Sequence, residues 1–231
     1  MNGVLAILLL AQLNAYWPAK EGSWIRYVAF RVLTYWDSGS RQLSVLQRYP
    51  HSDNHFVQIR WVDSPSLARS FNEKFVNKTA AGDVSELGEM QFEVNGLGQS
   101  LLGEVGRADA KFLVIPPEPK LPVDAAVWHR LQQWVMTTYH QVVDSRSGTA
   151  TTWPMLTKFA TVGHYDRWGV FPDVWCTSLE ELTVDGRSLA VYNYAFERGV
   201  GLVNFWYVNE WPFDANHMAW GWEYYAIAWS Q

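Results

Sequence analysis

The sequence is poor in cysteine and in clustered positive charge, and each shortage excludes a class of protein. Cys176 is the only cysteine among 231 residues, so the chain contains no internal disulfide. Its neighbours, DVWCTSL, indicate a strand interior, where a thiol behaves as a small apolar side chain. The 18 lysines and arginines stand singly and leave a formal net charge of −5, which argues against the basic surface that nucleic acid requires. We expect no nucleic-acid partner.

Long apolar segments are also lacking. The apolar run at residues 4–11 is well short of the roughly 20 residues that span a bilayer as a helix. It is followed by Leu13, Asn14 and Ala15, and a short apolar run that ends at small residues is typical of a secretory signal. We expect residues 1–15 to be a signal peptide or, alternatively, a retained apolar helix that brings residues 4–13 close to a membrane. The predicted location is periplasmic, cell-surface or extracellular.

No recognisable catalytic set is present. No serine lies in a nucleophile elbow. Gly199 and Gly201 lack the third glycine of a dinucleotide fingerprint, and the β-prone residues after them favour a turn or bulge between strands. His51 and His55 lie in YPHSDNHF, which we interpret as a surface turn that leads into a strand, not as a metal site. We expect a non-catalytic protein without a metal or other cofactor.

Aromatic residues are abundant, with 14 Trp, 11 Tyr and 11 Phe, and they concentrate in the C-terminal tail. Alternation in MAWGWEYYAIAW (218–229) predicts a strand whose two faces are both apolar. Such a strand is either central in the fold or docked on a partner or ligand. The residues that we expect to contact a ligand or partner are Trp206, Trp211, Phe213, Trp220, Trp222, Tyr224 and Trp229.

Most of the chain has the pattern of strands. FVQIRWV (56–62) and EMQFEV (89–94) alternate between apolar and polar residues, as half-buried strands do. The pairs Asn95-Gly96 and Asp185-Gly186 predict hairpin turns. Residues 124–142 suit a helix or a strand equally well. The predicted fold is mainly β, with antiparallel sheets in a curved sandwich or half-barrel, and a short apolar helix at the N-terminus.

A proline-rich segment divides the chain. IPPEPKLP (115–122) is expected to be extended and unable to join a central strand. The expected organisation is residues 1–15, a first β half at 16–115, a crossing at 116–122 and a second β half at 123–231. DSGSR (37–41) and DSRSG (144–148) suggest that the halves are duplicates, and one continuous antiparallel sheet is the alternative.

Three stretches carry a resemblance to a known family. YWPAKEGSWIRY (16–27), TVGHYDRWGVFPDVWCTSLEEL (161–182) and YNYAFERGVGLVNF (192–205) resemble the opening YYPLKVGNSWTY, the middle and the closing YYFAPGVGLVK of bacterial exported and lipoprotein β-rich domains of unknown function. The chain departs from this pattern at Glu197, Arg198 and Asn204, and no lipobox cysteine follows the apolar run. The resemblance implies a sheet-rich, non-enzymatic domain of the cell envelope or the extracellular space.

The function that these observations favour is binding without catalysis. We expect an exported binding or structural protein of the envelope or surface, acting as an accessory subunit that contacts a protein partner or another copy of itself. One alternative is a carrier of lipid or another small apolar ligand. A second alternative is a carbohydrate-binding module that contacts glycans through its tryptophans.

Overall fold

The computed structural model describes residues 15–18, 20–37, 42–62, 69–78, 84–95, 98–105, 110–122, 134–186, 188–208 and 218–230. These residues form twelve β-strands. The strands are β1 (Trp24–Asp37), β2 (Gln42–Val62), β3 (Arg69–Lys78), β4 (Val84–Asn95), β5 (Gly98–Val105), β6 (Ala110–Pro122), β7 (Trp134–Asp144), β8 (Ala150–Tyr165), β9 (Val174–Leu182), β10 (Ser188–Glu197), β11 (Gly201–Val208) and β12 (Met218–Trp229). The described part of the chain contains no helix that could cross a membrane.

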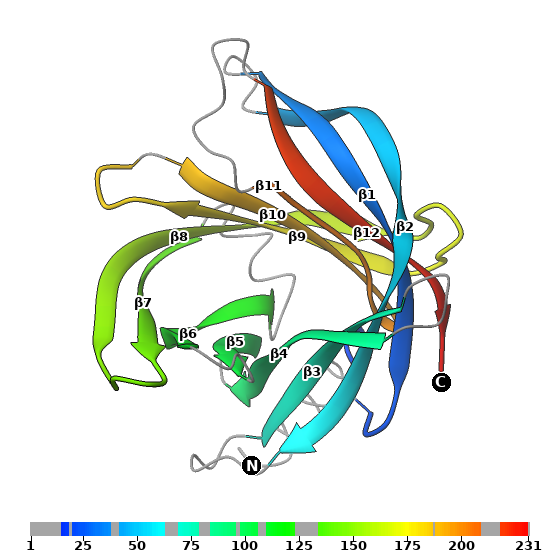
Figure 1. Cartoon of the computed structure of the whole chain (residues 1–231). Helices are drawn as coiled ribbons and strands as arrows, with labels where there is room; N and C mark the ends of the chain where they lie inside the picture. The colour runs from blue at the N-terminus through cyan, green and yellow to red at the C-terminus, as the bar shows by residue number, and fades with distance from the viewer. Residues whose placement is uncertain are drawn as a thin grey trace, which may run out of the picture.

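The strands form one antiparallel sheet in which each strand pairs with the next along the chain (Figure 1). β1 pairs with β2 on one side and with β12 on the other, so the strand order closes on itself. The predicted mainly β, antiparallel and curved fold is confirmed. The closure joins the first and last strands, which no local sequence pattern encodes.

Several predicted elements are found in the structure. FVQIRWV and EMQFEV lie within β2 and β4. Asn95 of β4 pairs with Gly98 of β5, which leaves a two-residue connection at the predicted hairpin. Gly186 adopts a φ of 84° in the turn between β9 and β10 and donates its amide hydrogen to the Thr183 carbonyl oxygen at 2.9 Å. Of the ambiguous segment 124–142, residues 134–142 belong to strand β7, which settles that part as strand.

The stretch YPHSDNHF is not the predicted turn. It lies inside β2, where His51 is exposed and its backbone is extended. The pairing with β1 shifts between Val28 and Phe30, whose partners are Asn54 and Pro50. β2 therefore accommodates its extra turn-prone residues as a bulge and continues as a strand.

The proline-rich segment forms the second part of β6. β6 pairs with β7 only from Ala110 to Ile115, whereas its pairing with β5 extends to Pro122. Pro116 and Pro117 lack the amide hydrogen that a ladder on both sides requires, so β6 is free to leave β7 after Ile115. The segment is extended, as predicted, and it carries Glu118 and Lys120 to buried positions.

The segment at residues 15–18 closes one end of the sheet. Tyr16 and Trp17 are buried against Phe92, Leu121 and Phe196. The Gly199 amide in the turn between β10 and β11 donates a hydrogen bond of 2.5 Å to the Ala15 carbonyl oxygen. YWP and ERGVG, which belong to two of the three stretches that carry the family resemblance, therefore pack against each other.

Some predictions concern residues outside the described part of the chain. These are the N-terminal apolar helix or signal at residues 1–14, the part of the ambiguous segment at residues 124–133, and the two tail aromatics Trp211 and Phe213.

Candidate functional site

Cross-strand register places a set of large side chains on one face of β8 to β12. Phe159 of β8 pairs with Leu179 of β9, and Leu179 pairs with Tyr192 of β10. Tyr192 pairs with Tyr207 of β11, which pairs with Trp222 of β12. Directly opposed residues in an antiparallel sheet share a face, so these five side chains lie on the same side of the sheet.

This shared face is the inner one. β6 does not neighbour β9 in the strand order, yet the Thr177 hydroxyl of β9 donates a hydrogen bond of 3.2 Å to the Lys120 carbonyl oxygen of β6. The Lys120 ammonium nitrogen also lies 5.3 Å from the ring centre of Tyr192. β6 thus reaches across the closed sheet to touch the face that carries Tyr192.

Six rings on this inner face form a continuous stack, which we call the aromatic ladder. The Phe205 and Tyr224 rings are nearly parallel, 4.5 Å apart at an angle of 9°, and Tyr192 and Tyr207 stack at 6.0 Å. Such parallel, offset pairs are a favourable aromatic geometry. All six rings are only half-buried, although they point inward. The ladder comprises Tyr192, Tyr194, Phe205, Tyr207, Trp222 and Tyr224.

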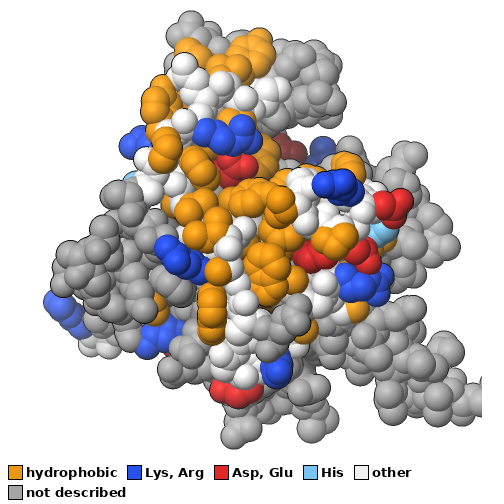
Figure 2. Space-filling view, turned by 90° about the vertical axis from the view of Figure 1, so that its right-hand side faces the viewer, with side chains coloured by type: hydrophobic (Ala, Val, Ile, Leu, Met, Phe, Trp, Pro, Cys, Tyr) orange, Lys and Arg blue, Asp and Glu red, His pale blue; other side chains and the backbone are white. Residues whose placement is uncertain are grey.

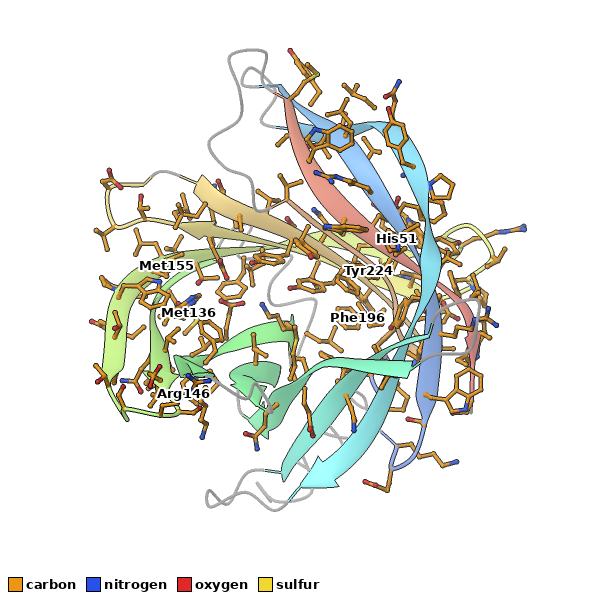
Figure 3. The ribbon with its side chains drawn as sticks, viewed as in Figure 1. His51, Met136, Arg146, Met155, Phe196 and Tyr224 are labelled. Carbon is orange, nitrogen blue, oxygen red and sulfur yellow. The ribbon has the colours of Figure 1, made fainter. Side chains whose placement is uncertain are left out.

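The two ends of the ladder differ. At one end Phe196 is fully buried and lies 5.2 Å from the Trp17 ring. At the other end Trp222 contacts His51 of β2 at 5.2 Å, and the nearby Tyr49 is 47% exposed. Figure 3 shows Phe196 and Tyr224 within the curve of the sheet, with His51 close to Tyr224. The inner face is therefore sealed at the Trp17 end and more accessible toward β2.

A polar cluster formed by Glu118, Lys120, His140 and Glu181 lies beside the ladder. Glu118 is 1% exposed and Lys120 is 7% exposed. The Lys120 ammonium binds Glu118 Oε1, and the Thr157 hydroxyl is 3.4 Å from Glu118 Oε2. His140 Nε2 lies 4.0 Å from the same Oε2 atom. Because burying charge is unfavourable unless it is paired, such a cluster in an interior points to a specific role.

Burial and mutual charge control the protonation of this cluster. Burial alone lowers the pKa of Lys120, but the carboxylate of Glu118 outweighs it, so the pKa is raised and the ammonium stays charged. Burial, reinforced by the charge of Glu118, raises the pKa of Glu181 to about 7. Burial lowers the pKa of His140, which keeps its imidazole neutral near neutral pH. The cluster therefore holds one firm ion pair, a carboxyl that titrates near neutrality and a neutral imidazole.

The ladder and the polar cluster are in contact. The Lys120 ammonium lies 5.3 and 5.5 Å from the ring centres of Tyr192 and Tyr194, within cation–π range. The Tyr192 hydroxyl donates a hydrogen bond of 3.4 Å to Glu181 Oε2. The candidate site is thus one surface, aromatic over β10 to β12 and charged where β6 crosses to β9.

The residues that the sequence predicts to contact a ligand or partner lie in different places in the structure. Trp222 and Tyr224 belong to the ladder, and the Arg31 guanidinium lies 4.9 Å above the ring of Trp220, which the register places on the same face. Trp206 lies on the opposite face of β11 from Tyr207 and pairs with Glu223. Trp229 is not part of the ladder. Its ring packs 5.7 Å from the ring of Phe171, in a separate cluster with the loop between β8 and β9. The predicted alternation of faces in the last strand is confirmed.

The sequence did not reveal the polar cluster. Glu118 and Lys120 stand two residues apart in an extended segment, so a shared face was readable in principle. His140 and Glu181 belong to β7 and β9, and they join Glu118 only because β6 leaves β7 and crosses the interior. That path is a tertiary feature without a local signal.

Comparison with known proteins finds likeness in structure alone. No protein-family model and no curated protein matches the sequence. Among solved structures, the chain is similar to an exported protein with a YmcC-like fold from Bacteroides fragilis, at a TM-score of 0.40 and 11% identity over 92% of this chain and 97% of that one. It is also similar to a lipoprotein from Parabacteroides distasonis, at a TM-score of 0.47 and 12% identity over 93% of this chain and 98% of that one. Likeness at this level carries no argument about function.

Proposed function

We propose that the chain is a non-catalytic binding protein whose inner face holds a small ligand with an apolar or aromatic body and a polar end. The aromatic ladder carries this proposal, because its six inward-facing rings remain half-buried and two of them, Tyr192 and Tyr194, contact Lys120 of the Lys120–Glu118 ion pair. Ligand sites are lined mainly by apolar and aromatic side chains with a few placed polar groups, and this surface has that composition. The apolar run at residues 4–11 supports a role outside the cytoplasm.

The contacts of the tail favour this role over docking of the tail on a protein. Trp222 and Tyr224 face the interior, and Trp229 packs on Phe171. Each of these three rings therefore has a ring partner within the chain. A ligand in the interior would contact the ladder, whereas a docked protein would need the same rings outside.

A binding titration with a matched pair of variants tests the proposal. The probe is 1-N-phenylnaphthylamine, an apolar fluorophore whose emission rises when it leaves water. We expect saturable binding to the full chain and a tenfold or greater loss of affinity in Tyr207→Leu. Trp206→Leu is the control, because Trp206 lies on the same strand but on the opposite face. Equal affinities in both variants and the parent protein, with circular dichroism unchanged, would contradict the proposal.

An accessory role at a protein interface is a second candidate, carried by one surface. Figure 2 shows hydrophobic side chains gathered in a band over the face that carries β1, β2 and β12, flanked by charged side chains. Exposed apolar residues on or near these strands include Leu46 at 51% and Ile227 at 45%. Contiguous exposed apolar surface is typical of protein contacts. Light scattering of Leu46→Ser against the parent chain tests self-association, and identical masses at all concentrations would argue against it.

A further inference from the structure

His140 presents an unusual polar atom to the polar cluster. Its side chain is 7% exposed, and among the described residues its Nε2 atom has no hydrogen-bond partner. The ring packs between Phe112, 5.3 Å away, and Trp153, 6.3 Å away, so the imidazole is held in a mainly aromatic setting. Buried polar side-chain atoms are nearly always satisfied, and an unsatisfied one requires an explanation. A ligand that accepts the nitrogen lone pair would provide it.

Two carboxylates stand beside this nitrogen. One oxygen each from Glu118 and Glu181 and one nitrogen of His140 lie within 4.8 Å of one another. The three residues come from β6, β9 and β7, so the arrangement depends on the crossing of β6. We propose that Glu118, His140 and Glu181 bind one divalent transition-metal ion, for which Zn²⁺ is the probe. This inference shares Glu118 with the surface proposed above to bind a ligand, but it does not require that ligand to bind. It departs from the expectation, drawn from the sequence, of no metal.

The geometry allows such a site with small side-chain movements. Zn²⁺ binds imidazole nitrogen and carboxylate oxygen at about 2.0–2.2 Å, which in a tetrahedron places ligand atoms about 3.4 Å apart. Because the three atoms lie within 4.8 Å of one another, each pair needs to approach by about 1.4 Å at most, a change on the scale of side-chain rotations. Three protein ligands also leave a fourth position for water or another donor, as in open metal sites.

Neighbouring groups are placed to orient these ligands. Lys120 binds Oε1 of Glu118, which leaves Oε2 directed toward His140 at 4.0 Å. The Tyr192 hydroxyl donates to Oε2 of Glu181 at 3.4 Å. Hydrogen bonds of this kind from a second layer of residues fix the orientation of metal ligands. Two carboxylates and one neutral imidazole form an oxygen and nitrogen set that suits divalent zinc, manganese, iron or cobalt.

The charge of Lys120 should affect the affinity for the metal ion. Its ammonium competes with a metal ion for the charge of Glu118, so its removal should strengthen metal binding. The Lys120→Met variant keeps the length and the apolar stem of the side chain and removes the positive charge. We expect its Zn²⁺ affinity to rise at least fivefold. Unchanged affinity in this variant would mean that the ion binds away from Lys120 and would contradict the proposed site.

The principal experiment is calorimetric titration of Zn²⁺ into the full chain after removal of metal with a chelator. We expect one ion per chain and a tenfold or greater loss of affinity in His140→Ala and Glu181→Gln. His51→Ala is the matched control, because His51 is an exposed histidine of β2 outside the cluster. Absence of binding to the parent chain, or equal affinity in His140→Ala, would overturn the proposal.

A measurement on the unaltered chain covers the case in which a variant fails to fold. The chain contains six histidines, and nitrogen NMR of their rings reports which nitrogen gains a metal. We expect Zn²⁺ to shift the Nε2 resonance of one histidine. The same shift should be seen in His51→Ala. A shift confined to His51, or no shift at saturating Zn²⁺, would overturn the proposal.

Discussion

The indole Nε1 of Trp17 donates a hydrogen bond of 3.0 Å to Oε1 of Glu73, and both side chains are buried. This bond joins the segment at residues 15–18 to β3 inside the closed end of the sheet. Burial raises the pKa of Glu73 to about 7, and the hydrogen bond from Trp17 opposes the rise only in part. The closed end therefore contains a carboxyl group that is costly to ionise.

Stability should fall as the pH rises through this pKa. The folded state holds the proton of Glu73 to about pH 7, whereas the unfolded chain releases it near 4.5. The stability that this proton provides is therefore fully present below about pH 4.5 and is lost as the pH rises to about 7, with no further loss above that. We expect Glu73→Gln to raise the free energy of unfolding by about 3 kcal/mol at pH 8.

The test is urea unfolding of both chains at pH 4 and pH 8. Glu73→Gln keeps the carbonyl acceptor for Trp17, so the two chains should have nearly equal stability at pH 4. A gain of the same size at both pH values would mean that the effect does not come from ionisation of Glu73.

The pKa of a second carboxyl group, that of Asp173, is shifted in the opposite direction, so its effect on stability has the opposite pH dependence. Burial opposes ionisation of Asp173, but hydrogen bonds from Tyr16, His164 and Arg198 outweigh it and lower the pKa to about 2. The contribution of Asp173 to stability is therefore present above about pH 4 and lost as the pH falls toward 2. Since its side chain is 29% exposed, we expect less than about 2 kcal/mol.

Acid unfolding followed by circular dichroism checks this expectation. Asp173→Asn should be less stable than the parent chain at pH 6 and equally stable at pH 2. Limited proteolysis at pH 6 should also release the segment at residues 15–18 faster in the variant, because Tyr16 donates to Asp173 at 2.6 Å. Parallel acid profiles of the two chains would contradict the assignment.

Gly221 of β12 should not tolerate a side chain. An added Cβ atom would overlap the backbone carbonyl oxygen of Tyr207 on β11, and it would also touch Val208. We expect Gly221→Ala to destabilise the fold by about 2 kcal/mol or more in urea unfolding. Trimming Val208 to alanine should not rescue the variant, because the principal overlap is with backbone. Full rescue would mean that the obstacle is the side chain of Val208.

Cys176 should react slowly in the folded chain. Burial raises the pKa of its thiol to about 11, so the reactive thiolate is scarce at pH 8. We expect modification by a disulfide reagent such as DTNB to be about 100-fold slower in the native chain than in urea. A native rate close to the unfolded rate would show that the thiol is accessible and ionised.

The sequence predicts the local elements well because their signals are local. Alternation in EMQFEV and the dipeptide at Asp185-Gly186 specify a strand and a hairpin within a few residues. The two-faced pattern of the last strand likewise places Trp222 and Tyr225 on opposite faces, as the structure has them. Which of the two faces is the inner one depends on the register between strands.

The candidate site is less predictable because it depends on two long-range features. The first is the crossing of β6, which brings Glu118 to His140 and Glu181. The second is a bulge in β2, where proline, histidine and aspartate residues that suggest a turn stay in a strand. In both cases tertiary pairing overrides the local preference of the residues.

The pairing of β1 with β12 has a consequence for how the chain reaches its structure. Tyr27 of β1 is paired with Ala226 of β12, so the ring can close only after nearly all of the chain is available. Contacts between such distant segments carry a large entropic cost and make folding slow. Until that step, β1 and β12 each offer an unpaired edge to other chains. A chain interrupted before residue 218 should therefore aggregate, even though every strand before that point has its sequential neighbour to pair with.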